Sequence, residues 1–340
     1  MPHPARSILA IDASPFGRSL ALLPAMRALR ASYPKALLVA ATSSGISELL
    51  GASGITDETI DLGVIKSSER RFTSSLKRFA GIVRRARRFN FDLVLDFSPR
   101  LETQITSRLF LGARTLTPSR IPRAIEVLLS FAAVPGAADS SAFSDYYKVL
   151  RQTGVELNDT RLVFAPRVEE DARFEERLAK SGSRGGELIV LLYASDPNDS
   201  RGWPAAAFAE VAVRLTNNLG ARIVAADEPS DDSFTNATNA LLPPGAIKLV
   251  RPRALELLAA IARASIVITD EPGLGQIASE LGTPVLEIAD TISASAMASS
   301  THRILEGSSR RRVSTDEVYE TACELIQDSR SASLFYRPEH

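Results

Sequence analysis

The residues between Ile261 and Asp290 constrain the fold more than any other stretch of this chain. An apolar, β-branched run at 265–269 predicts a strand that ends at the turn residues 270–273. A helical pattern follows, stops at 282–284, and gives way to a second short strand at 285–288. A strand, a glycine-containing turn, a helix and a strand in this order are typical of a parallel α/β sheet. Such a turn presents backbone N–H groups and the positive end of a helix dipole, where a phosphate can bind.

The same alternation of strands and helices continues along the rest of the chain. Short apolar runs predict further strands at 7–12, 37–41, 58–62, 91–97, 187–192 and 221–226. Helical spacing of apolar residues predicts helices at 19–31, 47–50, 73–89, 101–111, 140–153, 204–219, 255–262 and 316–326. Strands that alternate with helices favour doubly wound parallel sheets, and 340 residues suffice for two of them.

We therefore expect an α/β protein with two Rossmann-like domains that face a cleft. The first domain should span 1–160 and the second 161–340, with the division at about 160–186, where the flexible SGSRGG at 181–186 is the candidate boundary. The last helix could also pack back onto the first domain. Open α/β sheets bind ligands outside the carboxyl ends of their strands, so the cleft is the expected site.

Composition excludes several classes of protein. Forty basic and forty acidic residues balance, which argues against nucleic-acid binding through bulk charge. The single cysteine, Cys323, excludes structural disulfides, and with only His3, His302 and His340 no His/Cys metal cluster is predicted. No apolar run reaches the roughly 18 residues of a membrane span, and the apolar part of the start is too short for a signal peptide. We expect a cytoplasmic protein.

The predicted helix at 73–89 is unusually basic. Its apolar residues recur at helical spacing among Lys77 and arginines such as Arg84, Arg85, Arg87 and Arg88. Two interpretations stay open. The basic residues can form a solvated face, or they can attract anionic lipid or a phosphorylated glycolipid at a membrane surface.

Five segments, taken together, resemble one enzyme family. They read SPFGRSLALLPAM at 14–26, ALRASYPKA at 28–36, RRARRFNFDLVLDF at 84–97, DSRGWP at 199–204 and DEPGLGQIASELGTPV at 270–285. In their order and spacing they are similar to the motifs of the heptosyltransferases, glycosyltransferase family 9. Members of that family have the two-domain GT-B fold, with the acceptor bound by the N-terminal domain and the nucleotide sugar by the C-terminal domain.

The resemblance implies the transfer of a sugar from ADP-heptose, or another nucleoside-diphosphate sugar, to a lipopolysaccharide-core or related glycan acceptor. Such an enzyme must neutralise the leaving diphosphate and deprotonate the acceptor hydroxyl. No metal and no cofactor are expected, so positive side chains and backbone N–H groups would stabilise the diphosphate. The positions that match the family's donor site are Arg201, Asp231, Pro272, Gly273 and Gln276.

Arg201 replaces the family's lysine before Trp-Pro, and a guanidinium can bind diphosphate oxygens as well as an ammonium does. Gly273 and its neighbouring amides would hold the diphosphate. Asp231 lies near the family's ribose-binding acid, although it can equally be a solvated loop carboxylate.

Two positions depart from the family pattern. The family's general base is an aspartate where this chain has Arg18, and its diphosphate-binding histidine is Gln276 here. Arginine cannot act as a base at neutral pH, whereas it can bind an anionic acceptor together with Ser14. Asp12, at the end of the first predicted strand, is our candidate for the base. It could instead cap or orient the loop.

Asp96 and Glu102, near the end of the predicted strand at 91–97, are further candidates for the base. The alternative function is that of a catalytically degenerate relative that binds a nucleotide sugar or glycolipid without transfer. In either case the partners are a nucleotide sugar and a glycan or glycolipid, with no nucleic acid. Contact with the cytoplasmic face of the inner membrane would be peripheral.

Two other enzyme classes fit less well. Residues 273–278 also match G-x-G-x-x-A, the dinucleotide-binding fingerprint, with Glu287 or Asp290 as the ribose acid. That fingerprint belongs after the first strand of its domain, whereas here it follows a late one. A hydrolase is disfavoured because the chain has no G-x-S-x-G motif and His302 is its only interior histidine.

Overall fold

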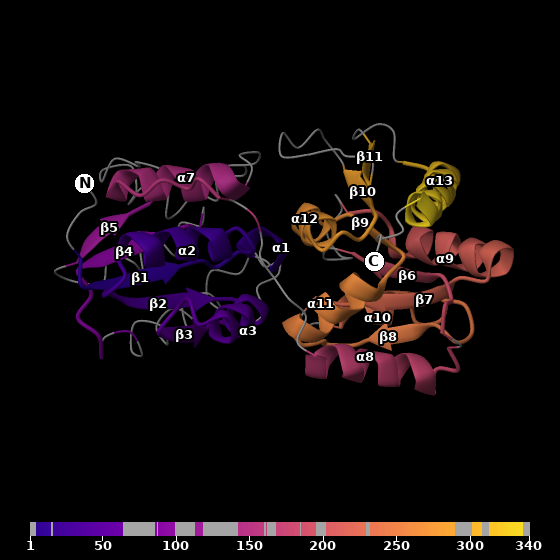
Figure 1. Ribbon diagram of the computed structural model, residues 1–340, viewed down its shortest axis with the longest axis horizontal. Coiled ribbons are helices and arrows are strands. Elements are labelled where there is room, and N and C mark those ends of the chain that lie inside the picture. The colour runs from indigo at the N-terminus through magenta and orange to yellow at the C-terminus, as the bar shows by residue number, and fades with distance from the viewer. Residues whose placement is uncertain are drawn as a thin grey trace, which may run out of the picture. The chain divides into compact units, whose positions relative to one another are not determined.

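The computed structural model describes residues 5–14, 16–63, 86, 88–98, 113–117, 142–159, 161, 168–183, 185–194, 202–228, 232–289, 301–307 and 313–335. The chain divides into two units, residues 1–162 and 163–340, and each unit has its own parallel sheet (Figure 1). The predicted helix at 101–111 and nearly all of the basic helix at 73–89 lie outside the described residues.

The described part of unit 1 forms a five-stranded sheet with helices between its strands. Its elements are β1 (Ser7–Ile11), α1 (Phe16–Ser19), α2 (Leu22–Ser32), β2 (Leu37–Thr42), α3 (Ser44–Ser53), β3 (Glu58–Asp61), β4 (Leu93–Asp96), β5 (Arg114–Leu116) and α7 (Ala142–Thr153). The described strands run in parallel in the order β3-β2-β1-β4-β5. The order reverses between β1 and β4. Open α/β sheets bind ligands at such a reversal, outside the carboxyl ends of the strands, and we call this place the crevice of unit 1.

Strand β1 is central because it can be buried on both faces. Leu9 and Ile11 point into a core that also contains Val39 of β2 and Val94 of β4. Ile8, which points to the opposite face of the sheet, is also fully buried. A strand that is apolar on both sides fits the middle of a parallel sheet and no exposed edge.

Unit 2 repeats this architecture, with six strands among its described residues. Its elements are α8 (Val168–Lys180), β6 (Ile189–Tyr193), α9 (Ala205–Leu219), β7 (Arg222–Ala226), α10 (Ser233–Thr238), β8 (Ile247–Leu249), α11 (Ala254–Arg263), β9 (Ile266–Thr269), α12 (Pro272–Glu280), β10 (Val285–Ala289), β11 (His302–Glu306) and α13 (Thr315–Phe335). The described strands are parallel in the order β11-β10-β9-β6-β7-β8, so the reversal falls between β6 and β9.

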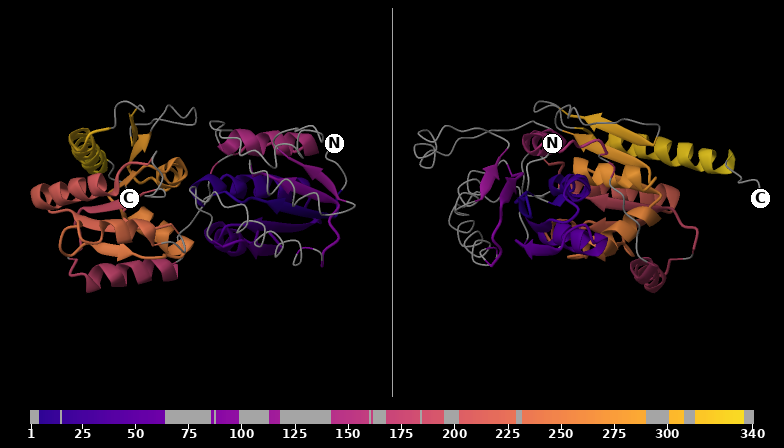
Figure 2. Two further views of the ribbon diagram at one scale, coloured as in Figure 1. Left: turned by 180° about the vertical axis from the view of Figure 1, so that it is seen from behind. Right: turned by 60° about the vertical axis from the view of Figure 1, so that its left-hand side comes forward.

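Helix α13 packs against α9 and against strands β9 and β10 of its own unit, and Figure 2 shows α13 and α9 side by side. The possibility that this helix also packs back onto unit 1 stays a prediction. The glycine-rich segment 181–186 connects α8 to β6 within unit 2. After α12 the chain turns at Gly282, whose φ of +77° favours glycine, as the sequence pattern predicts for the end of this helix.

An aromatic cluster fixes α9 and α10 on the sheet of unit 2. The ring of Phe208 is fully buried between Trp203 and Phe234, with centroid separations of 4.7 Å and 5.3 Å in edge-on geometry. Edge-on contacts of this kind add to the stabilisation that burial of the rings gives. The fold class predicted from the sequence, two doubly wound parallel α/β domains, is confirmed. No helix in the described part of the chain combines the length and apolar character needed to cross a membrane.

We expect Phe208→Ala to reduce the free energy of unfolding of unit 2 by about 3–5 kcal/mol, because the substitution leaves a cavity among aromatic rings. Trp203 is the only tryptophan of the chain and contacts Phe208, so its fluorescence during urea unfolding reports this unit. Phe208→Leu, which keeps most of the volume, should cost less than about 1.5 kcal/mol. Equal losses for the two variants would contradict the packing role.

Candidate functional site

The crevice in unit 1 lies where β1 and β4 end next to each other. Asp12 follows β1 directly, and its backbone N–H donates to the carbonyl of Ala41 at 2.8 Å, so the sheet continues to this residue. Asp96 is the last residue of β4 and pairs with Ile11 in register. The side chains of Asp12 and Asp96 are both fully buried. Two of the three carboxylates that the sequence proposes as a base are thus at one end of the sheet, and Glu102 lies outside the described residues.

Asp12 has both carboxylate oxygens engaged. Its Oδ1 accepts a hydrogen bond from the backbone N–H of Ser14 at 3.0 Å, which closes a turn in the loop after β1. Its Oδ2 accepts a hydrogen bond from the hydroxyl of Tyr146 on α7. The structure thus gives Asp12 the loop-orienting contact that the sequence leaves open as its alternative role. Its use as a base stays a prediction.

Tyr146 is the partner that the sequence did not identify. Its side chain is fully buried, and its ring stacks on that of Phe97 with the centroids 4.8 Å apart. Burial and the neighbouring charge of Asp12 raise the pKa of the Tyr146 hydroxyl well above 10. The hydroxyl therefore stays protonated and donates to Asp12 throughout the neutral range.

A second set of hydrogen bonds joins the loop after β1 to the end of β4. The backbone N–H of Ala13 donates to Ser98 Oγ at 2.6 Å, and the N–H of Ser98 donates to Asp96 Oδ1 at 3.0 Å. The carbonyl of Ser14 accepts from the hydroxyl of Ser19 at 2.9 Å. These contacts fix the backbone of the loop within the crevice, so Asp12 is held by a rigid support.

Ser14 and Arg18, the residues assigned to the acceptor, belong to this loop and to α1. Ser14 Oγ is buried and has no hydrogen-bond partner among the described residues. Arg18 Nη2 pairs with Asp145 Oδ2 at 2.7 Å, while Lys148 Nζ lies 3.4 Å from the other oxygen of Asp145. About 30% of the Arg18 side chain stays exposed, so it can still meet an anion.

In unit 2 the corresponding crevice lies between β6 and β9. Asp270 follows β9, and its Oδ2 accepts from the backbone N–H of Trp203 at 2.9 Å. The indole N–H of Trp203 donates to the carbonyl of Val313 at 3.0 Å. These two bonds hold the Trp-Pro segment at the carboxyl edge of the sheet, next to the start of α12.

The donor residues proposed from the sequence are only partly described. Pro272 and Gly273 form the first turn of α12, where helix N–H groups are available, and Gln276 lies one turn further. Gln276 Nε2 lies 3.4 Å from Glu280 Oε1. Arg201 and Asp231 are outside the described residues. Asp227 and Glu228, which follow β7, are acids at this edge that the sequence analysis did not select.

Acidic side chains gather at the carboxyl ends of β7 and β9. Asp227 accepts from the N–H groups of Phe234 and Thr235, at 2.8 and 3.0 Å, and so caps α10.

Glu271 is half-buried, and its burial together with the charges of Asp270 and Glu228 raises its pKa to about 8. At neutral pH the Glu271 carboxyl is therefore mostly protonated, which lowers the negative charge beside α12.

A buried histidine–glutamate hydrogen bond lies under α12. His302 Nε2 of β11 is 3.0 Å from Glu287 Oε2 of β10, and both side chains are almost completely buried. A Cβ added to Gly275 would lie 2.9 Å from Glu287 Oε2 and 3.6 Å from the His302 ring. Gly275 thus lets α12 approach this pair closely. No group of three or more metal-ligating side chains that could hold a metal ion is present among the described residues.

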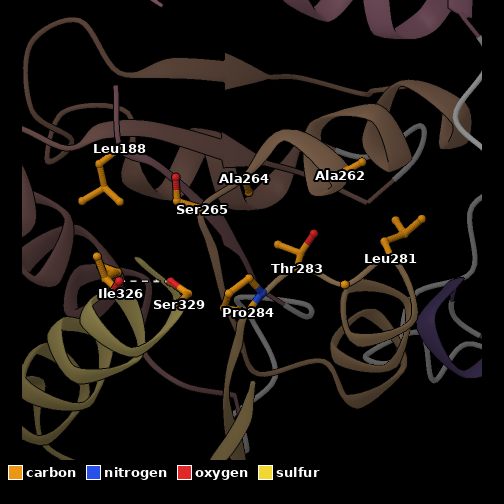
Figure 3. Close-up of a pocket in the computed structure, with 10 residues that line it drawn as sticks. Leu188, Ala262, Ala264, Ser265, Leu281, Thr283, Pro284, Ile326 and Ser329 are labelled. Carbon is orange, nitrogen blue, oxygen red and sulfur yellow. Dashed lines mark hydrogen bonds between the residues drawn. The ribbon is translucent and has the colours of Figure 1, made fainter. Parts of the chain in front are cut away.

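Figure 3 shows a cavity of about 290 Å³ elsewhere in unit 2. It is lined by residues just before β6, β9 and β10, such as Leu188, Ser265 and Pro284, and by Ile326 and Ser329 of α13. These residues lie at the amino ends of the strands. The cavity is therefore at the opposite edge of the sheet from Asp270 and the start of α12, and it contributes nothing to the crevice.

No protein-family model and no curated protein matches the sequence. Solved structures do match it over nearly their full length. A glycosyl transferase family 9 protein from Veillonella parvula has a TM-score of 0.70 and 16% identity, with 96% of this chain and 99% of that one covered. The chain has a GT-B-like fold.

Two further structures support this fold. The E. coli ADP-heptose lps heptosyltransferase II has a TM-score of 0.63 and 15% identity, covering 95% of this chain and 99% of its own. A Listeria monocytogenes structure described as a UDP-N-acetylglucosamine 2-epimerase has a TM-score of 0.57 and 15% identity, covering 97% of this chain and 90% of its own. The GT-B-like fold is shared by enzymes of different reactions, so the reaction must be argued from the site.

The raised pKa of Glu271 makes stability depend on pH. The unfolded chain, with an ordinary pKa of 4.5, releases the Glu271 proton before the folded chain does at about pH 8. The free energy of unfolding should therefore fall as the pH rises from about 4.5 to 8, by up to about 1.4 kcal/mol per pH unit, and level off above. Glu271→Gln should remove this decline in urea unfolding followed by Trp203 fluorescence, whereas the exposed Glu306→Gln should retain it.

Proposed function

We propose that this protein is a metal-independent glycosyltransferase. It transfers a sugar, heptose by its resemblance, from a nucleoside-diphosphate sugar to a lipopolysaccharide-core or related glycan acceptor. The observation that carries the proposal is the position of two of the family-like segments within a GT-B-like fold. The segment 84–97 supplies β4 of unit 1, and 270–285 supplies α12 after β9 of unit 2. Both reach the carboxyl edge of their sheet, where α/β folds bind ligands.

Similar structures support the choice of donor. Among them is the E. coli heptosyltransferase WaaC with ADP-2-deoxy-2-fluoro heptose, with a TM-score of 0.60 and 14% identity. For this chain we propose that the diphosphate binds at the first turn of α12, with Pro272, Gly273 and Gln276. Arg201 and Asp231 would bind the diphosphate and the ribose. The protonated state of Glu271 at neutral pH favours this placement, because a second negative charge beside the diphosphate would repel it.

For the acceptor we propose the loop after β1. Asp12 would take the proton of the acceptor hydroxyl, and Arg18 would bind a phosphate or carboxylate of the acceptor beside Ser14. A buried carboxylate with fixed hydrogen bonds is well oriented, and ligand closure would bring the hydroxyl to it. The protein would act in the cytoplasm, with peripheral contact to the inner membrane, and would have no nucleic-acid partner.

Nucleotide binding tests the donor site. Arg201→Ala should weaken the binding of ADP by about 1.5–3 kcal/mol, because a charge-assisted hydrogen bond to the diphosphate is lost. Isothermal titration with ADP, UDP and GDP measures this loss and identifies the nucleobase that the site prefers. Arg214→Ala is the matched control, since Arg214 on α9 pairs with Asp316 and should leave the affinity unchanged. Unaltered binding of every nucleotide by Arg201→Ala would contradict the assignment.

Turnover measurements test the assignment of Asp12 as the general base. Asp12→Asn keeps the size of the side chain but removes its basicity, so transfer should fall by roughly 10²–10⁴ while the affinity for nucleotide stays the same. Asp61→Asn, at the exposed end of β3, is the control at the same sheet edge. Wild-type activity that survives Asp12→Asn would refute the role of Asp12. Activity that appears only in an Arg18→Asp/Gln276→His double variant would instead identify the natural protein as a non-catalytic binder.

A further inference from the structure

Two adjacent residues of α7 contact the two charged residues of the site in unit 1. Asp145 pairs with Arg18 at 2.7 Å, and Tyr146 donates its hydroxyl to Asp12. These contacts join positions 127 and 134 residues apart in the sequence. One turn of one helix therefore sets the position of both groups that the proposed reaction needs on this side.

The burial of these residues separates them from their neighbours on α7. Tyr146 and Asp12 are fully buried, and only 8% of the Asp145 side chain is exposed. Tyr147, the next residue, is 43% exposed and lies beside Arg151 in a cation–π contact. A buried hydroxyl and a buried carboxylate cost stability unless they are paired, so their pairing constrains both sides of the contact.

The two hydrogen bonds to Asp12 have different origins. The N–H of Ser14 belongs to the same loop, so it would move together with Asp12. The hydroxyl of Tyr146 comes from a distant element whose ring is fixed by stacking on Phe97. The hydrogen bond from Tyr146 thus positions the Asp12 carboxylate relative to the rest of unit 1. Together with the bond from Ser14 it holds the carboxylate group in one orientation.

We propose that Asp145 and Tyr146 are positioning residues of the transfer site, with Tyr146 acting through Asp12 and Asp145 acting through Arg18. The inference rests on the proposed function and deepens it, because it assigns α7 to the acceptor side. Neither residue is required to touch the substrate. A carboxylate displaced by even about 1 Å from the acceptor hydroxyl can lose about 10²-fold in rate.

Tyr146→Phe tests the first half. It keeps the ring that stacks on Phe97 and removes only the donor, so kcat for ADP-heptose transfer should fall by about 10–100-fold with an unchanged KM for the donor. Tyr147→Phe is the matched control on the same helix and should behave as wild type. Because burial and Asp12 raise the pKa of the Tyr146 hydroxyl well above 10, Tyr146→Phe should leave the phenolate absorbance at 295 nm unchanged in a native-state titration to about pH 10.

A double variant separates positioning from general stability. If Tyr146 acts through Asp12, Asp12→Asn/Tyr146→Phe should turn over at the rate of Asp12→Asn alone, because the group to be positioned has already lost its function. A further loss of more than about threefold in the double variant would overturn the role. If Tyr146→Phe alone does not fold, the rates of Asp12→Asn/Tyr146→Phe and Asp12→Asn can still be compared, because the double variant buries no unpaired carboxylate.

The second half uses Asp145 in the same way. Asp145→Ala should raise KM about tenfold for a deacylated lipopolysaccharide-core oligosaccharide that carries phosphate, with kcat nearly unchanged. Asp145→Asn keeps an oxygen that accepts from Arg18, and it should restore the wild-type KM. In an Arg18→Ala background neither substitution should change KM. A rise in KM that persists in that background would contradict action through Arg18.

The failure of this inference can be told apart from failure of the proposed function. A wild-type protein that neither transfers sugar nor hydrolyses any of the ADP, UDP and GDP sugars overturns the proposed function and the role of α7 with it. An active wild type that is indifferent to both Tyr146→Phe and Asp145→Ala overturns the role of α7 alone.

Discussion

A carboxylate shielded from water must find its hydrogen-bond donors within the protein, and this requirement at Asp12 organises unit 1. The backbone of Ser14 provides one donor and the Tyr146 hydroxyl provides the other. For the second contact, α7 has to lie against the end of β1, with the ring of Tyr146 stacked on that of Phe97. The loop after β1, the end of β4 and α7 therefore form one connected structure at the crevice.

The fold could be predicted because its main signals are local. Apolar strands that alternate with amphipathic helices report burial on both faces of a parallel sheet, and β1 and β9 lie within one or two residues of their predicted bounds. The elements that were missed lack such a signal. Helix α8 is dominated by charged residues, and its buried face consists of few positions, including Phe174 and Leu178. Strands β5 and β8 have only three residues each, which is too short for a periodicity to be recognised.

The site was less accessible to sequence reasoning because its contacts join distant segments. The sequence placed Asp12 at the end of a strand, and it follows β1 directly, whereas Arg18, expected in a loop, lies in the short helix α1. Their partners Asp145 and Tyr146 lie in a predicted helix, but nothing in its pattern distinguishes Tyr146 from the exposed Tyr147. The pair of His302 and Glu287 was missed for the same reason, since adjacent parallel strands bring together residues that no local motif connects.

The glycine at position 275 has a structural cause that is independent of any ligand. It lies against the buried carboxylate of Glu287, where the space for a methyl group is already occupied. The G-x-G-x-x-A pattern in this segment thus arises at least in part from packing between α12 and the strands below it. A side chain at position 275 would therefore require the Glu287 carboxylate to move from its contact with His302, so substitutions at 275 in relatives of this chain should coincide with changes at 287.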